Sequence, residues 1–187
     1  MRKNRTKWMT YNGLLAAIIV VMAMVPFLGF LTFGTVAIQL ISIPVIIGGI
    51  LFGWKSATFL SLVFGLFSMF VAATRGGAGD LIFTNPLVSV LPRLLFGLSI
   101  VPIYNMVKGL VKNEDLSAGI TALLSTLVHS VVVIVALFIV LGIQTNSFNT
   151  NFSSIIGALI TVNVLVEAIA AVIIVVPVVK ALRRIVD

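Results

Sequence analysis

The chain of 187 residues contains no cysteine and one histidine, and few of its residues are charged. Without cysteine it can form no disulfide, no thiolate metal site and no cysteine nucleophile. Charged residues make up 9% of the chain, whereas a soluble domain carries roughly a quarter. This shortage excludes an ordinary water-soluble enzyme and, despite the net charge of +7, a nucleic-acid-binding module. We therefore expect no metal site, no cofactor in this chain and no nucleic-acid partner.

Hydrophobic residues make up 60% of the chain, and its mean hydropathy is +1.26. A helix needs about 20 apolar residues to cross the hydrocarbon core of a bilayer. Runs of about that length are continuously apolar, which excludes the alternating pattern of a membrane β-barrel. The connections between them are short, so we expect one integral-membrane domain over residues 1–187. The six predicted spans cover 11–30, 36–53, 55–74, 85–107, 117–142 and 153–182.

The basic residues lie almost entirely on one side of these spans. Arg75 is the exception, and Arg93 falls inside a span. The apolar runs predict an all-α polytopic protein, a bundle of six transmembrane helices. Because Lys and Arg mark cytoplasmic loops, we expect its N- and C-termini both to be cytoplasmic. The ten residues on the cytoplasmic side are Arg2, Lys3, Arg5, Lys7, Lys55, Lys108, Lys112, Lys180, Arg183 and Arg184.

Three ionisable residues lie at membrane depth: Arg93, His129 and Glu167. A charge at the centre of a span costs about 2.5–3.5 kcal/mol on insertion scales, and such residues usually mark functional sites. The sequence shows no catalytic carboxylate pair and no phosphate-binding loop, so we expect no enzymatic activity. Any ATP must therefore be used by another subunit.

Arg93 shares a helical face with Asn85 and Ser89, because the three recur at four-residue intervals. Pro92 interrupts the same span and frees a carbonyl group, which is tolerated where protein or a cavity covers it. This polar stripe is typical of a site for an anion or a polyol. Two roles are open for Arg93: contact with a ligand, or a structural ion pair with Glu167.

Glu167 follows Asn163 by four residues, so these two also share a face. Glu167 is either the counter-ion of Arg93 or a direct ligand contact. His129 lies midway along the fifth predicted span, among serine and threonine residues. It is either a hydrogen-bonding partner between helices or a further ligand contact.

Two segments carry a resemblance to a known family. Residues 43–53 read IPVIIGGILFG before a tight basic turn, and residues 91–97 read LPRLLFG. With six predicted helices, nearly the whole chain resembles the substrate-binding S components of energy-coupling factor (ECF) vitamin transporters. Among these it looks most like the pantothenate-specific member.

The resemblance implies a high-affinity subunit that captures a vitamin at the outer face of a prokaryotic plasma membrane. The subunit would then dock on a transmembrane T component driven by two cytoplasmic ATPases. Pantothenate is favoured, with Arg93 pairing its carboxylate and Asn85, Ser89, His129 or Asn163 contacting its amide and hydroxyl groups. The alternatives are folate, riboflavin or biotin as the vitamin, a membrane assembly subunit without a ligand, or a small membrane enzyme.

The family docks through a pair of small residues on its first helix, usually two alanines four residues apart. That pair maps onto Gly13 and Ala17. Glycine at the first position preserves a close approach of two helices.

Overall fold

The computed structural model describes residues 2–25, 28–33, 36–75, 81–145 and 150–186. These residues form six α-helices, one short β-hairpin and one 3-10 turn. In chain order the elements are α1 (Arg2–Met24), β1 (Phe30–Phe33), β2 (Val36–Gln39), α2 (Ser42–Phe52), α3 (Trp54–Arg75), η1 (Leu81–Thr84), α4 (Pro86–Leu110), α5 (Glu114–Thr145) and α6 (Thr150–Val186).

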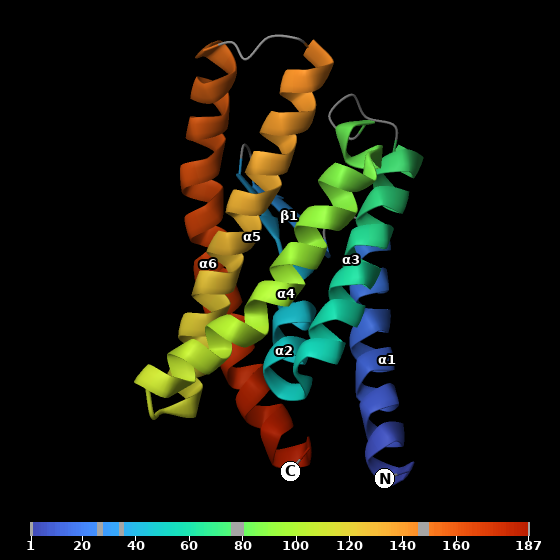
Figure 1. The fold of residues 1–187 in the computed structure, drawn as a ribbon, viewed down its shortest axis with the longest axis vertical. Helices are drawn as coiled ribbons and strands as arrows, with labels where there is room; N and C mark the ends of the chain where they lie inside the picture. Colours follow the sequence, from blue (N-terminus) through green and yellow to red (C-terminus); the bar gives the residue numbers. More distant parts are fainter. Residues whose placement is uncertain (1, 26–27, 34–35, 76–80, 146–149, 187) are drawn as a thin grey trace.

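The long helices form a bundle in which α4 packs against both α3 and α5, and α5 packs against α6. Helix α4 crosses the bundle obliquely, and the start of α1 lies at the same end of the molecule as the end of α6 (Figure 1). By length and composition, five described helices are apolar enough to cross a membrane. The predicted helical membrane architecture is confirmed to that extent.

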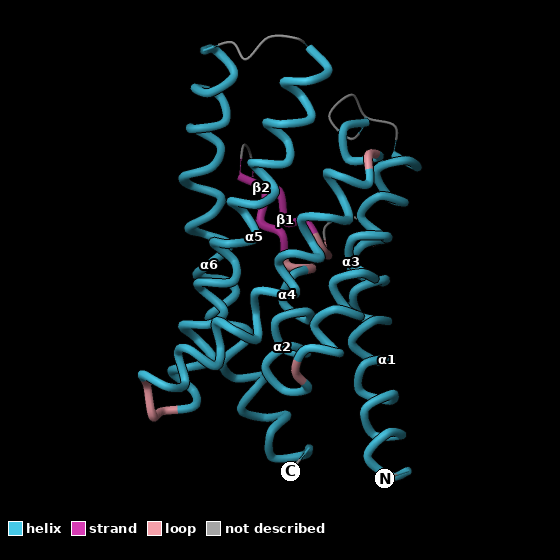
Figure 2. The backbone as a smooth tube through the Cα atoms, in the orientation of Figure 1, coloured by secondary structure: helices cyan, strands magenta, loops and turns pink. Residues whose placement is uncertain are grey.

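The predicted span over 36–53 is wrong as a single helix. Residues Val36–Gln39 instead pair antiparallel with Phe30–Phe33, and the helix that follows has only 11 residues (Figure 2). At about 1.5 Å per residue, α2 rises roughly 16 Å, about half the thickness of the hydrocarbon core. Pairing with β1 gives backbone N–H and C=O groups of Val36–Gln39 the hydrogen-bond partners that a longer helix would have supplied internally.

Helix α2 is surrounded by protein, since it contacts α1, α3, α4, α5 and α6. Each residue from Ser42 through Ile50 is buried. A helix enclosed in this way is apolar on all sides. This explains why the sequence of α2 is continuously hydrophobic and resembles that of a membrane span. The helix ends at Gly53, whose φ of 76° lies in the left-handed region that favours glycine.

Helices α3 and α4 approach closely at two glycines. A Cβ atom added at Gly65 would lie 2.9 Å from the Cα of Val90, and one added at Gly97 would lie 2.8 Å from the carbonyl oxygen of Ala57. The close approach brings α3 and α4 together in the part of the bundle where the buried polar residues lie.

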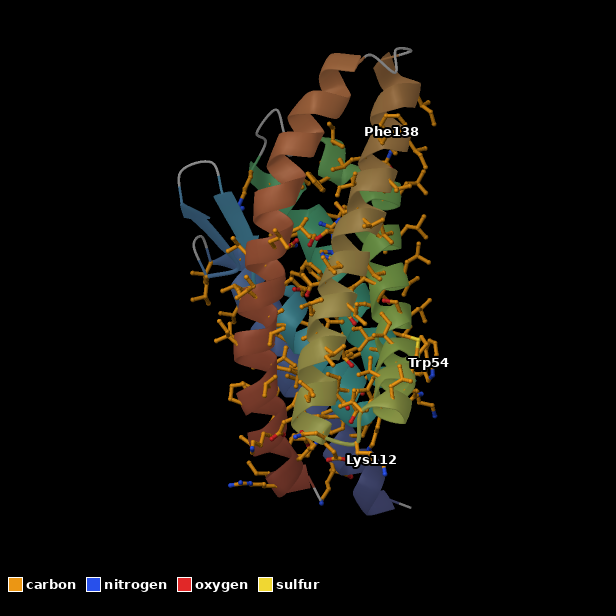
Figure 3. All side chains as sticks on the ribbon, turned by 90° about the vertical axis from the view of Figure 1, so that its left-hand side faces the viewer. Trp54, Lys112 and Phe138 are labelled. Carbon is orange, nitrogen blue, oxygen red and sulfur yellow. The ribbon has the colours of Figure 1, made fainter. Side chains whose placement is uncertain are left out.

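Ion pairs join α4, α5 and α6 at the end that holds the chain termini. Glu114, the first residue of α5, accepts hydrogen bonds from Lys108 and Arg183, each at 2.9 Å. Lys180 contacts Asp115 at 2.5 Å, and Arg183 also donates to the hydroxyl of Tyr104. Lys112 lies at this end and Phe138 near the opposite end (Figure 3). Exposed pairs of this kind each stabilise a protein by at most about 1 kcal/mol.

Replacing Gly97 by alanine is expected to destabilise the protein, because the added Cβ would press against the backbone of α3. Overpacking of this kind costs about 1–3 kcal/mol, so the thermal midpoint in detergent should fall. Gly109→Ala is the matched control, since a Cβ added there would meet no atom of another described element within 4 Å. Equal midpoints for the two variants would contradict the close packing of α3 and α4.

Candidate functional site in the bundle interior

Buried polar side chains gather along α4 and α5. Two ionisable residues are among them: Arg93 is 4% exposed and His129 is 2% exposed. Such residues inside an apolar bundle need polar partners, because burying a polar group without a hydrogen bond in hydrocarbon costs roughly several kcal/mol. The buried polar residues of these two helices are Ser89, Arg93, Ser117, Thr121, Ser125, Thr126, His129 and Ser130.

Arg93 supplies the hydrogen-bond donor that a backbone carbonyl of α4 lacks because of the neighbouring Pro92. Proline has no N–H, so the carbonyl oxygen four residues earlier, that of Val88, lacks its helical donor. The Nη1 of Arg93 donates to this oxygen at 2.6 Å. Its guanidinium carbon also lies 5.5 Å from the ring centre of Phe64 and 5.6 Å from that of Phe83, within the range of cation–π attraction.

The guanidinium of Arg93 retains donors for another partner. An arginine side chain carries five N–H groups, and Nε of Arg93 is buried with no hydrogen-bond partner in the described part of the chain. Among the described residues no ion pair joins Arg93 to Glu167. A buried cation with a free donor and no nearby carboxylate partner is suited to an anionic ligand.

His129 belongs to the same cluster as Arg93, because both contact Phe64. The imidazole lies 5.8 Å from the ring of Phe64 and 4.8 Å from that of Phe96, measured between ring centres. Its Nε2 and the Oγ of Ser125, one turn earlier on α5, are both buried without partners among the described residues. His129 thus offers an unpaired imidazole nitrogen beside α3 and α4, and Ser125 offers an unpaired hydroxyl one turn away on α5.

Asn85 and Ser89 instead have structural partners. Asn85 caps the N-terminus of α4, where its side-chain oxygen accepts a hydrogen bond from the backbone N–H of Leu87 at 3.0 Å. Ser89 donates its hydroxyl proton to the carbonyl oxygen of Phe83, which fastens η1 to α4. A role for either residue in ligand contact remains a prediction.

Glu167 lies on α6 and accepts a hydrogen bond at 2.8 Å from the backbone N–H of Gln39, at the end of β2. It therefore contacts the hairpin. Asn163 also lies on α6, but its side chain is outside the described part of the structure. The predicted roles of both residues in ligand contact stay predictions.

The roles of Phe64, Phe83 and Phe96 could not be identified from the sequence. The chain has 13 phenylalanines, and their spacing does not indicate which ones face Arg93 or His129. Ser125 offered a weak signal, since it precedes His129 by one helical turn and therefore shares its face.

The cluster has the chemistry of a binding site for a small polar anion. It offers a cation, an imidazole and a hydroxyl, enclosed by aromatic rings. Within the described residues, no group of three or more His, Cys, Asp or Glu side chains is placed to hold a metal ion.

Arg93→Leu should lower the free energy of unfolding by about 1–3 kcal/mol, because the buried carbonyl of Val88 loses its donor. Adding Pro92→Ala should recover part of this loss, since alanine supplies the missing helical N–H. Chemical denaturation of the detergent-purified variants measures both effects. Pro102→Ala in the Arg93→Leu background is the control, because Pro102 interrupts the same helix at another carbonyl. Equal recovery with either proline replacement would contradict the proposed pairing.

Comparison with known proteins places the chain in a family. A family model described as ECF transporter, substrate-specific component, matches residues 7–179. The chain is 33% identical over 110 residues to a protein named Pantothenate transporter PanT from Leuconostoc mesenteroides subsp. mesenteroides. This match covers 56% of the chain and 54% of the relative, so it spans about half the length of that relative. The chain belongs to the family of substrate-specific components of ECF transporters, a family of transporter subunits and not of enzymes, and its five long apolar helices fit a multi-pass membrane protein.

Proposed function

We propose that this chain captures pantothenate at the outer face of the cell membrane. The observation that carries the proposal is the buried guanidinium of Arg93, which has a free Nε donor and no carboxylate partner among the described residues. Pantothenate has a carboxylate that such a group would bind through charge-assisted hydrogen bonds. The name of the relative from Leuconostoc supports the same vitamin.

The remaining groups of pantothenate, one amide and two hydroxyls, need further donors and acceptors. The unpaired Nε2 of His129 and Oγ of Ser125 suit a hydroxyl or an amide. In this proposal Asn163, Asn85 and Ser89 are further polar contacts. Arg93 fixes the orientation of the ligand, because it is the cation of the cluster.

The proposed topology has six membrane-embedded helices and cytoplasmic termini. The clustering of basic residues on one side supports this orientation, and the start of α1 and the end of α6 lie at one end of the bundle (Figure 1). With this orientation Arg93, the eighth residue of α4, lies closer to the outer face than to the cytoplasm.

Delivery of the ligand to the cytoplasm would require partners. We propose that a transmembrane T component and two ATPase subunits supply the energy from ATP, with no cofactor bound to this chain. Gly13 and Ala17 are exposed on α1, and a Cβ added at Gly13 would meet no atom of another described element within 4 Å. Their small side chains leave this face of α1 open to the close approach of a partner helix.

The purified chain should bind pantothenate at least about tenfold more tightly than panthenol, which carries an alcohol in place of the carboxylate, because only the acid can pair with Arg93. Arg93→Gln should weaken binding of pantothenate and remove most of this preference. Isothermal titration calorimetry measures both. Lys108→Gln is the control, since Lys108 is an exposed cation at the far end of α4. No binding of pantothenate by the folded wild-type chain would refute the proposed ligand, and a panel of folate, riboflavin and biotin would then be tested.

Ala17→Leu should reduce co-purification with the T component and ATPases while the affinity for pantothenate is unchanged, because a bulky side chain would separate the two helices. Ala73→Leu on the exposed face of α3 is the matched control. Intact assembly of the Ala17→Leu variant, or equal loss in both variants, would contradict docking through this face of α1.

A further inference from the structure

The backbone N–H of Gln39 cannot be satisfied by the hairpin itself. Gln39 lies opposite Phe30 in the strand register, and the next pair is closed by a 2.9 Å hydrogen bond from the N–H of Leu40 to the carbonyl of Gly29. In an antiparallel pair, neighbouring residues direct their N–H groups to alternate sides. The N–H of Gln39 therefore points away from β1, toward the open edge of β2.

The N–H groups along an open strand edge have no partner within the sheet, and this edge belongs to a strand that contacts α6. Glu167 supplies an acceptor: its Oε1 accepts the N–H of Gln39 at 2.8 Å, across 128 residues of sequence. Helix α6 packs against β2, so the bond joins two elements already in contact.

Gln39 is also the last residue of β2 and lies just before α2. Its carbonyl oxygen accepts the hydroxyl of Ser42 at 3.4 Å, and α2 starts three residues later. The side-chain Nε2 of Gln39 is buried and has no partner among the described residues. The position of its backbone therefore decides where a free amide donor lies within the bundle.

We infer that Glu167 is a positioning residue that fastens the β1–β2 hairpin to α6 and thereby fixes the buried amide of Gln39. Its contribution to ligand capture rests on the function proposed above. In this role Glu167 affects the ligand site through the backbone of the hairpin, and the group it needs is the oxygen that accepts the N–H of Gln39. Its negative charge is dispensable, because glutamine presents an oxygen of the same reach.

The position of the hairpin can be measured without a ligand. The chain has no cysteine, so Leu28→Cys and Leu165→Cys, which are 48% and 56% exposed in the wild type, can carry spin labels for pulsed electron paramagnetic resonance. The distance distribution should be equally narrow with Glu167 and with Glu167→Gln, and should broaden or shift with Glu167→Leu. Glu114→Leu at the far end of α5 is the control and should change nothing. An unaltered distribution in Glu167→Leu would overturn the inference.

Calorimetry with pantothenate then tests whether the acceptor or the charge matters for capture. Glu167→Leu should weaken binding by about tenfold or more, and Glu167→Gln should stay within about threefold of the wild type. If Glu167→Gln is as weak as Glu167→Leu, Glu167 acts through its charge, as a ligand contact or as a counter-ion, and the inference is overturned. If the wild type binds no pantothenate, the proposed function fails, whereas the spin-label distances still decide the positioning role.

Discussion

The structure depends on one constraint: backbone N–H and C=O groups inside an apolar bundle must find partners within the protein. Regular helices meet this requirement by themselves. At two departures from regular helix, the proline-interrupted start of α4 and the hairpin that precedes α2, an ionisable side chain supplies a missing partner. Arg93 donates to the carbonyl of Val88, and Glu167 accepts the N–H of Gln39. The buried charges thus lie where the backbone departs from a continuous helix.

This arrangement changes what the two charges mean for binding. Had they paired with each other, the guanidinium would have been neutralised and a ligand carboxylate would have had to displace Glu167. Arg93 instead uses one donor for the backbone and keeps Nε free, while Phe64 and Phe83 flank the guanidinium. The cation is therefore held in place before any ligand arrives, which reduces the entropy lost when a ligand binds.

The sequence predicted the helical membrane class, which follows from hydropathy and length, and it singled out the ionisable residues. It did not predict their partners, since counting residues along a helix gives depth and not the direction in which a side chain points. The hairpin also has a sequence signal, but the neighbouring apolar run obscures it. Phe30–Phe33 and Val36–Gln39 are rich in aromatic and β-branched residues around a glycine. However, Val36–Gln39 adjoins the apolar run of α2, and the two together have the length of a membrane span. Only the tertiary fold shows that α2 is enclosed by five helices and need not span.

The bond between Arg93 and the carbonyl of Val88 also has an evolutionary consequence. A descendant that comes to import an uncharged nutrient would have no anion for Arg93 to bind, yet losing the arginine while Pro92 remains would leave the carbonyl of Val88 without its donor. Selection on the fold alone would preserve the pair. A Pro-Arg dipeptide kept at this position would then reflect helix geometry as well as ligand chemistry. A change of specificity can begin at positions such as Ser125, where no backbone group depends on the side chain among the described contacts.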